Sequence, residues 1–223
     1  MITRVAIIDD HKLFRKSFEL LISQIQGVEV VFMASNGLDL IEVLESKTVV
    51  IDLVFLDIQM PKMDGYQTAA ILTKKYPEIK ILILTSYNDV YSVIRMLDYN
   101  IAGYLTKNTK PKDIRNAILT VRESGVYFDK NITTSLKDLD LDMNQKPLLV
   151  TLSDRELELI KLFAKQYNGR EIADKLSISF RTVEKHKEIL MQKTQSYNFI
   201  GVIMYAFLRH YIDESDFIRP SKK

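Results

Sequence analysis

The chain lacks cysteine and long apolar runs, and each absence excludes a class of protein. Without cysteine there is no disulfide bond and no cysteine-ligated metal site. No apolar run approaches the ~20 residues that a membrane-spanning helix needs. Met1 to Arg4 lead directly into an apolar segment and show no signal-peptide pattern. We therefore expect a cytoplasmic protein without a membrane partner.

An excess of charge of one sign is also missing from most of the chain. The 223 residues carry a formal net charge of +2. Residues 1–128 hold 15 Lys+Arg and 15 Asp+Glu, a net charge of zero, whereas residues 151–223 hold 13 and 10, a net charge of +3. The length suits two domains. The second is mildly basic, which suits an anionic partner without proving one.

Apolar and amphipathic segments alternate through the first 125 residues. Short β-branched runs predict five strands, at residues 4–8, 28–33, 53–57, 80–84 and 102–105. Helical spacing predicts five helices, at residues 13–25, 36–45, 65–75, 90–97 and 114–121. Asp10 is placed to cap the first helix, whose apolar face includes Leu13. Because the strands are apolar on both faces, we expect a five-stranded parallel, doubly wound α/β domain of flavodoxin-like fold.

Polar residues stand where four of these strands end. They are Asp9 with Asp10, then Asp57, Thr85 and Lys107. The carboxyl ends of parallel strands meet at one edge of a sheet, where ligands bind. Gathered carboxylates repel one another unless a cation lies among them. Oxygen ligands favour Mg²⁺ or Mn²⁺, and a carboxylate with a metal, a lysine and a hydroxyl suits phosphoryl transfer to Asp57.

Each of these residues alone has an ordinary explanation. Asp9 and Asp10 are common helix caps, and Asp57 and Thr85 are common turn residues. A lysine that follows a strand, such as Lys107, is usually a solvated charge. Their joint occurrence at the same edge of one predicted sheet favours a site.

Residues 1–125 resemble the receiver domain of two-component response regulators. The matching segments are Asp9-Asp10-His11, Asp57-Ile58-Gln59-Met60-Pro61, Asp64-Gly65, Leu84-Thr85-Ser86 and Gly103-Tyr104-Leu105-Thr106-Lys107. One departure is Asn108, because many receivers carry a cis proline after this lysine.

This resemblance implies that Asp57 accepts phosphate from a sensor histidine kinase. It implies that Asp9, Asp10, Asp57 and the backbone carbonyl of Gln59 arrange Mg²⁺ directly or through water. It also implies that Thr85 and Lys107 bind the phosphoryl oxygens, and that Tyr104 changes rotamer together with Thr85.

The alternation ends after residue 128, and the rest of the chain is helical. Residues 129–150 are acidic, weakly patterned and interpreted as a linker. Ser153 and Glu156 form a capping-box pattern before a first helix. Asn168-Gly169 begins a short helix, and Ser179 caps a longer one that runs through Met191. A last helix is expected to extend to Tyr211.

The short and the long helix form a helix-turn-helix candidate. On the long helix Val183, Ile189 and Leu190 are expected to face the core. Arg181, Thr182, Lys185 and Lys187 are expected to face outward, where a helix reads the major groove. A solvated amphipathic helix is the alternative, which Glu184 and Glu188 among the basic residues favour.

Residues 151–212 resemble the LuxR-type helix-turn-helix of the NarL/FixJ response regulators. The matching residues are Leu152-Ser153, Arg155-Glu156, Glu171-Ile172-Ala173, Leu176, Ser179, Thr182-Val183, His186, Ile189 and Lys193. Glu188 and Thr194 depart from residues common there. The resemblance implies a recognition helix at about 179–193, with Ser179, Arg181, Thr182, Lys185 and Lys187 as DNA contacts. It gives His186 a structural place, not a metal-binding one.

We therefore expect a receiver domain at 1–128, a linker at 129–150, an all-α DNA-binding domain at 151–212 and a tail at 213–223. The expected function is phosphorylation-controlled transcription regulation and not turnover catalysis. Expected partners are a sensor histidine kinase, promoter DNA, a second copy when phosphorylated, and RNA polymerase as a further candidate.

Three other functions remain open. They are a phosphatase of the haloacid-dehalogenase type, an interaction module with a decayed output domain, and constitutive DNA binding. The phosphatase normally needs a second aspartate two residues after its nucleophile, where this chain has Gln59. The acidic cluster argues against the constitutive binder.

Overall fold

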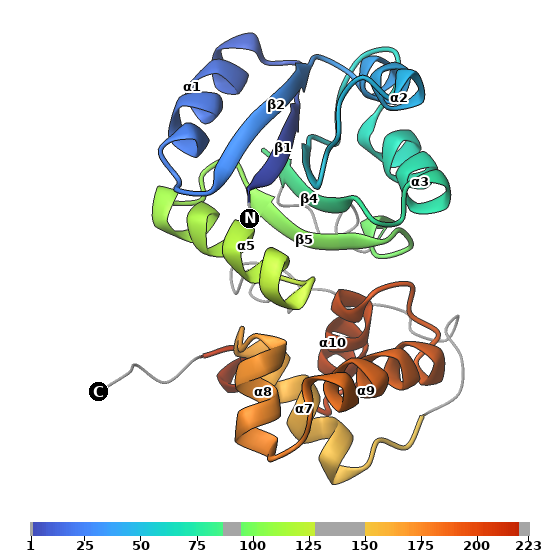
Figure 1. Ribbon diagram of the computed structural model, residues 1–223. Helices are drawn as coiled ribbons and strands as arrows, with labels where there is room; N and C mark the ends of the chain where they lie inside the picture. Colours follow the sequence, from blue (N-terminus) through green and yellow to red (C-terminus); the bar gives the residue numbers. More distant parts are fainter. Residues whose placement is uncertain (1, 87–94, 128–149, 219–223) are drawn as a thin grey trace.

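The structure is a computed structural model that describes residues 2–86, 95–127 and 150–218. It holds a layered α/β part, at residues 2–127, and a helical part, at residues 150–218 (Figure 1). Most of the helix expected at 90–97, all but the last residue of the linker expected at 129–150 and the end of the expected tail lie outside these residues. No helix in the described ranges is long and apolar enough to cross a membrane.

Five strands form one parallel sheet, as the sequence predicted. They are β1 (Thr3–Ile8), β2 (Val28–Ala34), β3 (Leu53–Leu56), β4 (Lys80–Thr85) and β5 (Ile101–Thr106). The strand order is β2-β1-β3-β4-β5 and every pairing is parallel. The connections reverse direction between β1 and β3, so the edge at the carboxyl ends of these two strands is the place where this fold binds ligands.

Helices cover both faces of this sheet (Figure 1). They are α1 (Lys12–Ser23), α2 (Gly37–Ser46), α3 (Gly65–Lys75) and α5 (Pro111–Ser124). Helices α1 and α5 pack on one face through residues such as Phe18, Ile22 and Ile118, and α2 and α3 pack on the other. The central strands are therefore buried on both sides, which explains their uniformly apolar sequences.

Helix α3 begins directly against the end of β3. Asp64 and Gln67 form a capping box at its first turn. The backbone N–H of Gly65 donates to the carbonyl of Ile58 at 2.8 Å. A Cβ atom at Gly65 would lie 2.3 Å from the carbonyl oxygen of Asp57. Only glycine permits this approach, and the approach fixes the backbone that carries Asp57.

The helical part contains α7 (Asp154–Ala164), α8 (Gly169–Leu176), α9 (Phe180–Lys193), α10 (Phe199–Leu208) and the 3₁₀-helix η2 (Glu214–Phe217). The predicted capping box of Ser153 and Glu156 is present, and Asn168 and Ser179 cap the two helices that they were expected to start. These caps satisfy N–H groups that the first turn of a helix leaves without partners.

The segment after α10 is folded and packs on α7. The carboxylate of Asp216 is buried and lies 3.1 Å from the ammonium of Lys161. The ring of Phe217 meets the ring of Phe207 edge to face, with centroids 5.5 Å apart. Residues 213–217, expected as part of a tail, are therefore an integral part of the helical fold.

Three details of the expected elements were wrong. His11, not Asp10, is the N-cap residue of α1, and the carboxylate of Asp10 pairs with the His11 ring instead. Leu13 is 82% exposed although its spacing placed it on the buried face. Helix α10 ends at Leu208, and the hydroxyl of Tyr211 donates to the carbonyl of Val150.

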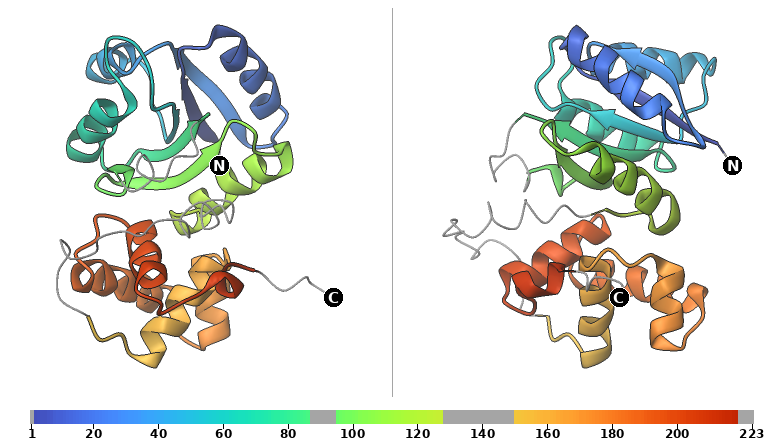
Figure 2. Two further views of the ribbon diagram at one scale, coloured as in Figure 1. Left: turned by 180° about the vertical axis from the view of Figure 1, so that it is seen from behind. Right: turned by 90° about the vertical axis from the view of Figure 1, so that its left-hand side faces the viewer.

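The helical part lies beside the β5 edge of the sheet in both views of Figure 2, where α10 contacts β5. The side chains of Asn198, Lys187 and Asn168 donate hydrogen bonds to groups of the α/β part. Polar side chains of the helical part thus contact the end of α5 and the segment that leads into β5.

The close approach at Gly65 generates a first prediction. Gly65→Ala is expected to lower the free energy of unfolding by about 1–3 kcal/mol, because the added methyl group meets backbone atoms that have no room to move. Urea unfolding followed by circular dichroism measures this change. Lys74→Ala, on an exposed position of the same helix, is the control and should change stability by less than about 0.5 kcal/mol. Equal stability of both variants would contradict the packing argument.

Candidate functional site

The polar residues at the strand ends meet at one edge of the sheet, as predicted. The ammonium nitrogen of Lys107 lies 2.6 Å from Asp9 Oδ2 and 2.7 Å from Asp57 Oδ2. Asp9 follows β1, Asp57 follows β3 and Lys107 follows β5. The parallel order of these strands is what brings three residues from distant parts of the sequence together.

The backbone around Asp57 holds its carboxylate in a fixed place. The N–H of Asp57 donates to the carbonyl of Ile8 at 2.9 Å, and Asp57 Oδ1 accepts the N–H of Ile58 at 2.8 Å. The residue is 4% exposed. Burial raises the pKa of Asp57 above its ordinary value, and the contact with Lys107 offsets this only in part. The carboxylate is therefore poorly hydrated and is held in place beside the ammonium of Lys107.

Lys107 is held from three directions. Its backbone N–H donates to the carbonyl of Thr85 at 2.9 Å, and its ammonium lies 4.9 Å from the centroid of the Phe14 ring. Burial by itself would lower the pKa of Lys107, but the contacts with Asp57 and Asp9 outweigh burial and raise it. No peptide bond in the described ranges is cis, and the lysine reaches both carboxylates with Asn108 following it.

Acidic groups gather around this lysine. Asp9, Asp10, His11 and Asp57 each offer a ligand atom, and these atoms all lie within 4.8 Å of one another. Asp9 Oδ2 is buried and makes the ion pair with Lys107 but no hydrogen bond of good geometry. Three carboxylates facing one cation leave an excess of negative charge, which fits a hard divalent cation such as Mg²⁺.

Sequence reasoning missed one member of this cluster. His11 Nδ1 lies 2.8 Å from Asp10 Oδ1, and the backbone N–H of His11 donates to Asp9 Oδ1 at 2.8 Å. Its position directly after the two aspartates was the available signal. Its effect here is to hold the loop between β1 and α1 against the carboxylates.

An open hollow of about 590 Å³ adjoins the cluster. Its lining is Asp10, Ile58, Gln59, Met60, Pro61, Asp64, Tyr66 and Arg95. Gln59 and Asp10 therefore line the same hollow. The guanidinium of Arg95 lies 4.1 Å from the centroid of the Tyr66 ring, so one wall is cationic. The hollow leaves this edge of the sheet open to solvent.

Two further predicted residues lie behind the cluster. Thr85 ends β4 and is fully buried, and Tyr104 in β5 is 2% exposed. The register pairs Ile83 with Tyr104 and Thr85 with Thr106. The two side chains thus belong to neighbouring strands.

The second candidate site is the outer side of α9. Ser179, Arg181 and Lys185 are exposed and Thr182 is half-buried, as expected for residues that reach DNA. Lys187 was expected beside them but is 9% exposed, because it shares the inner side of the helix with Val183 and Leu190. Ile189, expected in the core, is 41% exposed. His186 is not part of the metal-ligand group found in the described residues.

Comparison with known proteins assigns both parts of the chain to families. The model of the response regulator receiver domain matches residues 5–119, and the model of bacterial regulatory proteins of the luxR family matches residues 150–206. The chain is a response regulator of the NarL/FixJ family. This response regulator is thus a phosphorylation-controlled transcription regulator, and its two domains imply a histidine kinase and promoter DNA as partners.

Relatives of this response regulator cover nearly its whole length. The oxygen regulatory protein NreC of Staphylococcus epidermidis is 32% identical over 219 residues, which is 94% of this chain and 99% of NreC. NreC of Staphylococcus aureus is 35% identical over 198 residues, which is 85% of this chain and 90% of NreC.

Solved structures resemble it as well. RcsB of Salmonella enterica serovar Typhimurium, bound to the promoter rprA in the presence of the phosphomimetic BeF₃⁻, is 26% identical, with a TM-score of 0.56. The match covers 91% of this chain and 97% of RcsB. An RcsB–DNA complex matches with a TM-score of 0.58 and 25% identity over 92% of this chain and 98% of that one.

The shared ammonium generates a second prediction. Lys107→Met leaves Asp9 and Asp57 buried without a cation, so the free energy of unfolding at pH 7, without divalent cations, should fall by about 3 kcal/mol. The raised pKa of Asp57 sets the sign. A folded carboxyl group that holds its proton more tightly than the unfolded chain loses stability as pH rises through its pKa.

In the variant the pKa of Asp57 rises further. The Lys107→Met variant should therefore lose stability relative to the native chain as the pH rises from about 4 to about 7. Chemical unfolding at several pH values measures this. Lys112→Met, an exposed lysine of α5, is the matched control, and a parallel pH profile for both variants would contradict the prediction.

Proposed function

We propose that Asp57 accepts a phosphoryl group from a phosphohistidine of a sensor kinase. The observation that carries this proposal is the position of Lys107, which lies within 2.7 Å of the Asp57 carboxylate and pairs with Asp9 at 2.6 Å at the same sheet edge. A carboxylate oxygen of Asp57 forms the new O–P bond while the N–P bond of the donor breaks. The regulator takes part in this transfer and in the later hydrolysis of its aspartyl phosphate, in which water attacks phosphorus and inorganic phosphate leaves, without acting as a turnover enzyme.

The surrounding residues have separate roles in this proposal. Asp9, Asp10, Asp57 and the backbone carbonyl of Gln59 hold Mg²⁺, which when bound neutralises charge on the phosphoryl group. Lys107 and Thr85 donate to phosphoryl oxygens. The ion pair with Lys107 keeps the ammonium at the place where those oxygens arrive.

Phosphorylation adds roughly −1.5 to −2 charge and strong acceptor oxygens at Asp57. Thr85 is drawn toward them, and Tyr104 changes rotamer with it. The pairing of β4 with β5 supports this proposal, because both residues lie on neighbouring strands. The change biases the surface of the receiver that adjoins its last strand and helices.

The proposed DNA contacts are Ser179, Arg181, Thr182 and Lys185. Their exposure on the outer side of α9 supports this choice, and the burial of Lys187 removes that residue from the set. A phosphorylated homodimer would place two such helices on half-sites about one helical turn apart. The RcsB structures bound to promoter DNA support this arrangement by analogy.

The domain limits and cellular setting complete the proposal. We keep a receiver at 1–128, a linker at 129–150 and a DNA-binding domain that begins at 151. We also propose a cytoplasmic location and RNA polymerase as a further partner.

A third prediction tests the phosphoacceptor. With a small phosphoryl donor such as acetyl phosphate and Mg²⁺, the native chain should gain one phosphoryl group by mass spectrometry and Asp57→Asn should gain none. Asp98→Asn changes an exposed aspartate and should be modified like the native chain. If Asp57→Asn were phosphorylated as much as the native chain, Asp57 would not be the acceptor.

A fourth prediction tests the DNA contacts. Arg181→Ala and Lys185→Ala should each weaken binding to a 20-bp duplex selected by this protein from a random pool, and each should reduce the slope of log affinity against log salt by about 1. Fluorescence anisotropy at four salt concentrations measures the slope. Lys16→Ala in the receiver is the control. Unchanged slopes for both α9 variants would place the DNA contact elsewhere.

A further inference from the structure

One lysine of α9 lies on the inner side of the helix. Lys187 stands four residues after Val183 and three before Leu190, and all three are buried. Its ammonium lies 5.3 Å from the ring centroid of Phe163 and 5.9 Å from that of Phe199. A lysine at this position costs stability unless its charge is satisfied, so its partners indicate its role.

One partner of Lys187 belongs to the receiver. Its Nζ donates to the carbonyl of Ser124 at 3.0 Å, and Ser124 is the last residue of α5. Gly125 then leaves the helix in the left-handed conformation. Carbonyls at the end of a helix lack partners within the helix and carry its negative pole, so a cation is favoured there. Glu184 lies 3.2 Å from the same ammonium and adds a second acceptor.

Asn198 makes a second contact between the domains. Its Nδ2 donates to the carbonyl of Tyr99 at 2.6 Å and to that of Leu97 at 3.4 Å, and the residue is buried. Its Oδ1 accepts the N–H of Gly201 at 2.8 Å and so caps α10. One side chain therefore joins the first turn of α10 to the segment that leads into β5.

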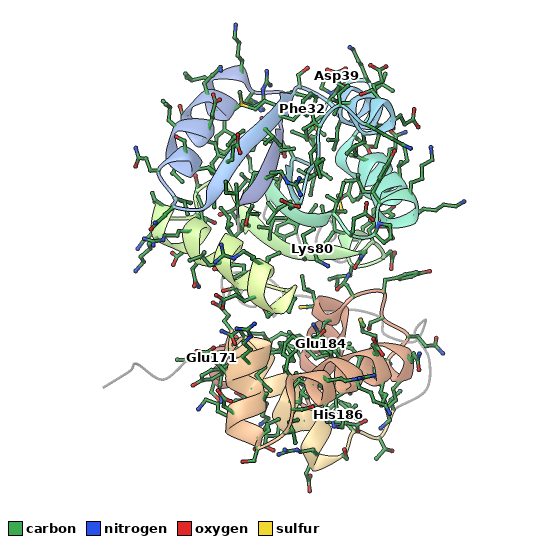
Figure 3. All side chains as sticks on the ribbon, in the orientation of Figure 1. Phe32, Asp39, Lys80, Glu171, Glu184 and His186 are labelled. Atoms are coloured by element: carbon green, nitrogen blue, oxygen red, sulfur yellow. The ribbon has the colours of Figure 1, made fainter. Side chains whose placement is uncertain are left out.

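Charges gather where the two domains meet. Lys80, at the start of β4, has a pKa lowered first by burial and then by Lys187, while Glu184 opposes the shift. Figure 3 shows Lys80 at the edge of the sheet that faces the helical domain, and Glu184 on α9. Glu184 thus lies near both lysines and reduces their repulsion across the contact.

We propose that Lys187 and Asn198 form a latch that fixes the orientation of the helix-turn-helix domain on the receiver. Lys187 is then a positioning residue and not a DNA contact. The latch leaves Ser179, Arg181 and Lys185 exposed, so the docked receiver orients the outer side of α9 without covering these residues.

Through the latch, a change in the receiver would also change the orientation of the helix-turn-helix domain. The carbonyl of Tyr99 lies two residues before β5, which carries Tyr104. A shift of β5 changes the distance from that carbonyl to Asn198 and loosens the latch. This step rests on the proposed function, whereas the contact itself does not.

The first experiment measures the contact directly in the full chain. The absence of native cysteine allows spin labels at Glu42→Cys and Asp174→Cys, two exposed positions on α2 and α8. The distance distribution between the labels is recorded by pulsed electron paramagnetic resonance in the absence of a phosphoryl donor. Adding Lys187→Met, which keeps an apolar stem but removes the donor, should widen the distribution about twofold, because domains joined by small interfaces move independently.

A second variant covers the case in which Lys187→Met does not fold. Asn198→Asp keeps the capping oxygen, since Asp and Asn cap equally well, but it replaces the donor to Tyr99 with an acceptor. It should widen the distribution as well, with native helix content by circular dichroism. Lys185→Met, on the outer side of α9, is the matched control and should leave the distribution unchanged. Unchanged distributions in both latch variants would overturn the proposal.

The second experiment tests whether the contact only orients the helix-turn-helix domain. The alternatives are that the receiver covers the outer side of α9, or that Lys187 itself contacts DNA. Binding of the Lys187→Met variant to the selected 20-bp duplex should keep the native salt slope, with affinity within about twofold. A slope reduced by about 1 would make Lys187 a phosphate contact, and a tenfold rise in affinity, about 1.4 kcal/mol, would mean that the docked receiver covers the reading side. Either outcome overturns the proposal.

Failure of the proposed DNA binding can be distinguished from failure of the latch. If the native chain binds no duplex while the label distances still respond to Lys187→Met, the DNA-binding function falls and the latch stands.

Discussion

The structure depends on one ammonium group shared by two buried carboxylates. Lys107 lies between Asp9 and Asp57 at the edge where β1, β3 and β5 end. Without this cation the carboxylates would repel each other in a poorly hydrated place. With it, part of the negative charge is neutralised, and the excess that remains makes the site sensitive to any further charged group. A phosphoryl group is such a group, since it brings negative charge to the one cation present among these side chains.

The fold and the receiver site were accessible from sequence because their signals are local. Apolar runs such as Leu53 to Leu56 mark buried strands, and a parallel sheet brings every strand end to the same edge. Three strand ends therefore sufficed to place Asp9, Asp57 and Lys107 together. The capping box at Ser153 was predicted for the same reason, because a cap depends on residues within one turn.

The errors came from properties that periodicity does not determine. Leu13 has helical spacing, but no element among the described residues covers it, so its exposure depends on packing. Lys187 has the residue type of a DNA contact but the angular position of a core residue. Its hydrogen bond to the carbonyl of Ser124, 63 residues earlier in the chain, joins two domains, and no local pattern encodes such a contact.

The packed segment after α10 has a practical consequence for dissecting this protein. Asp216 is buried against Lys161, and Phe217 covers Phe207, so the helical domain is closed by residues that lie beyond the 150–206 region shared with the luxR family. A DNA-binding fragment cut at that family boundary would expose α7 and lose its buried ion pair. Recombinant fragments should therefore retain the chain through residue 218, and affinity tags belong at the other end.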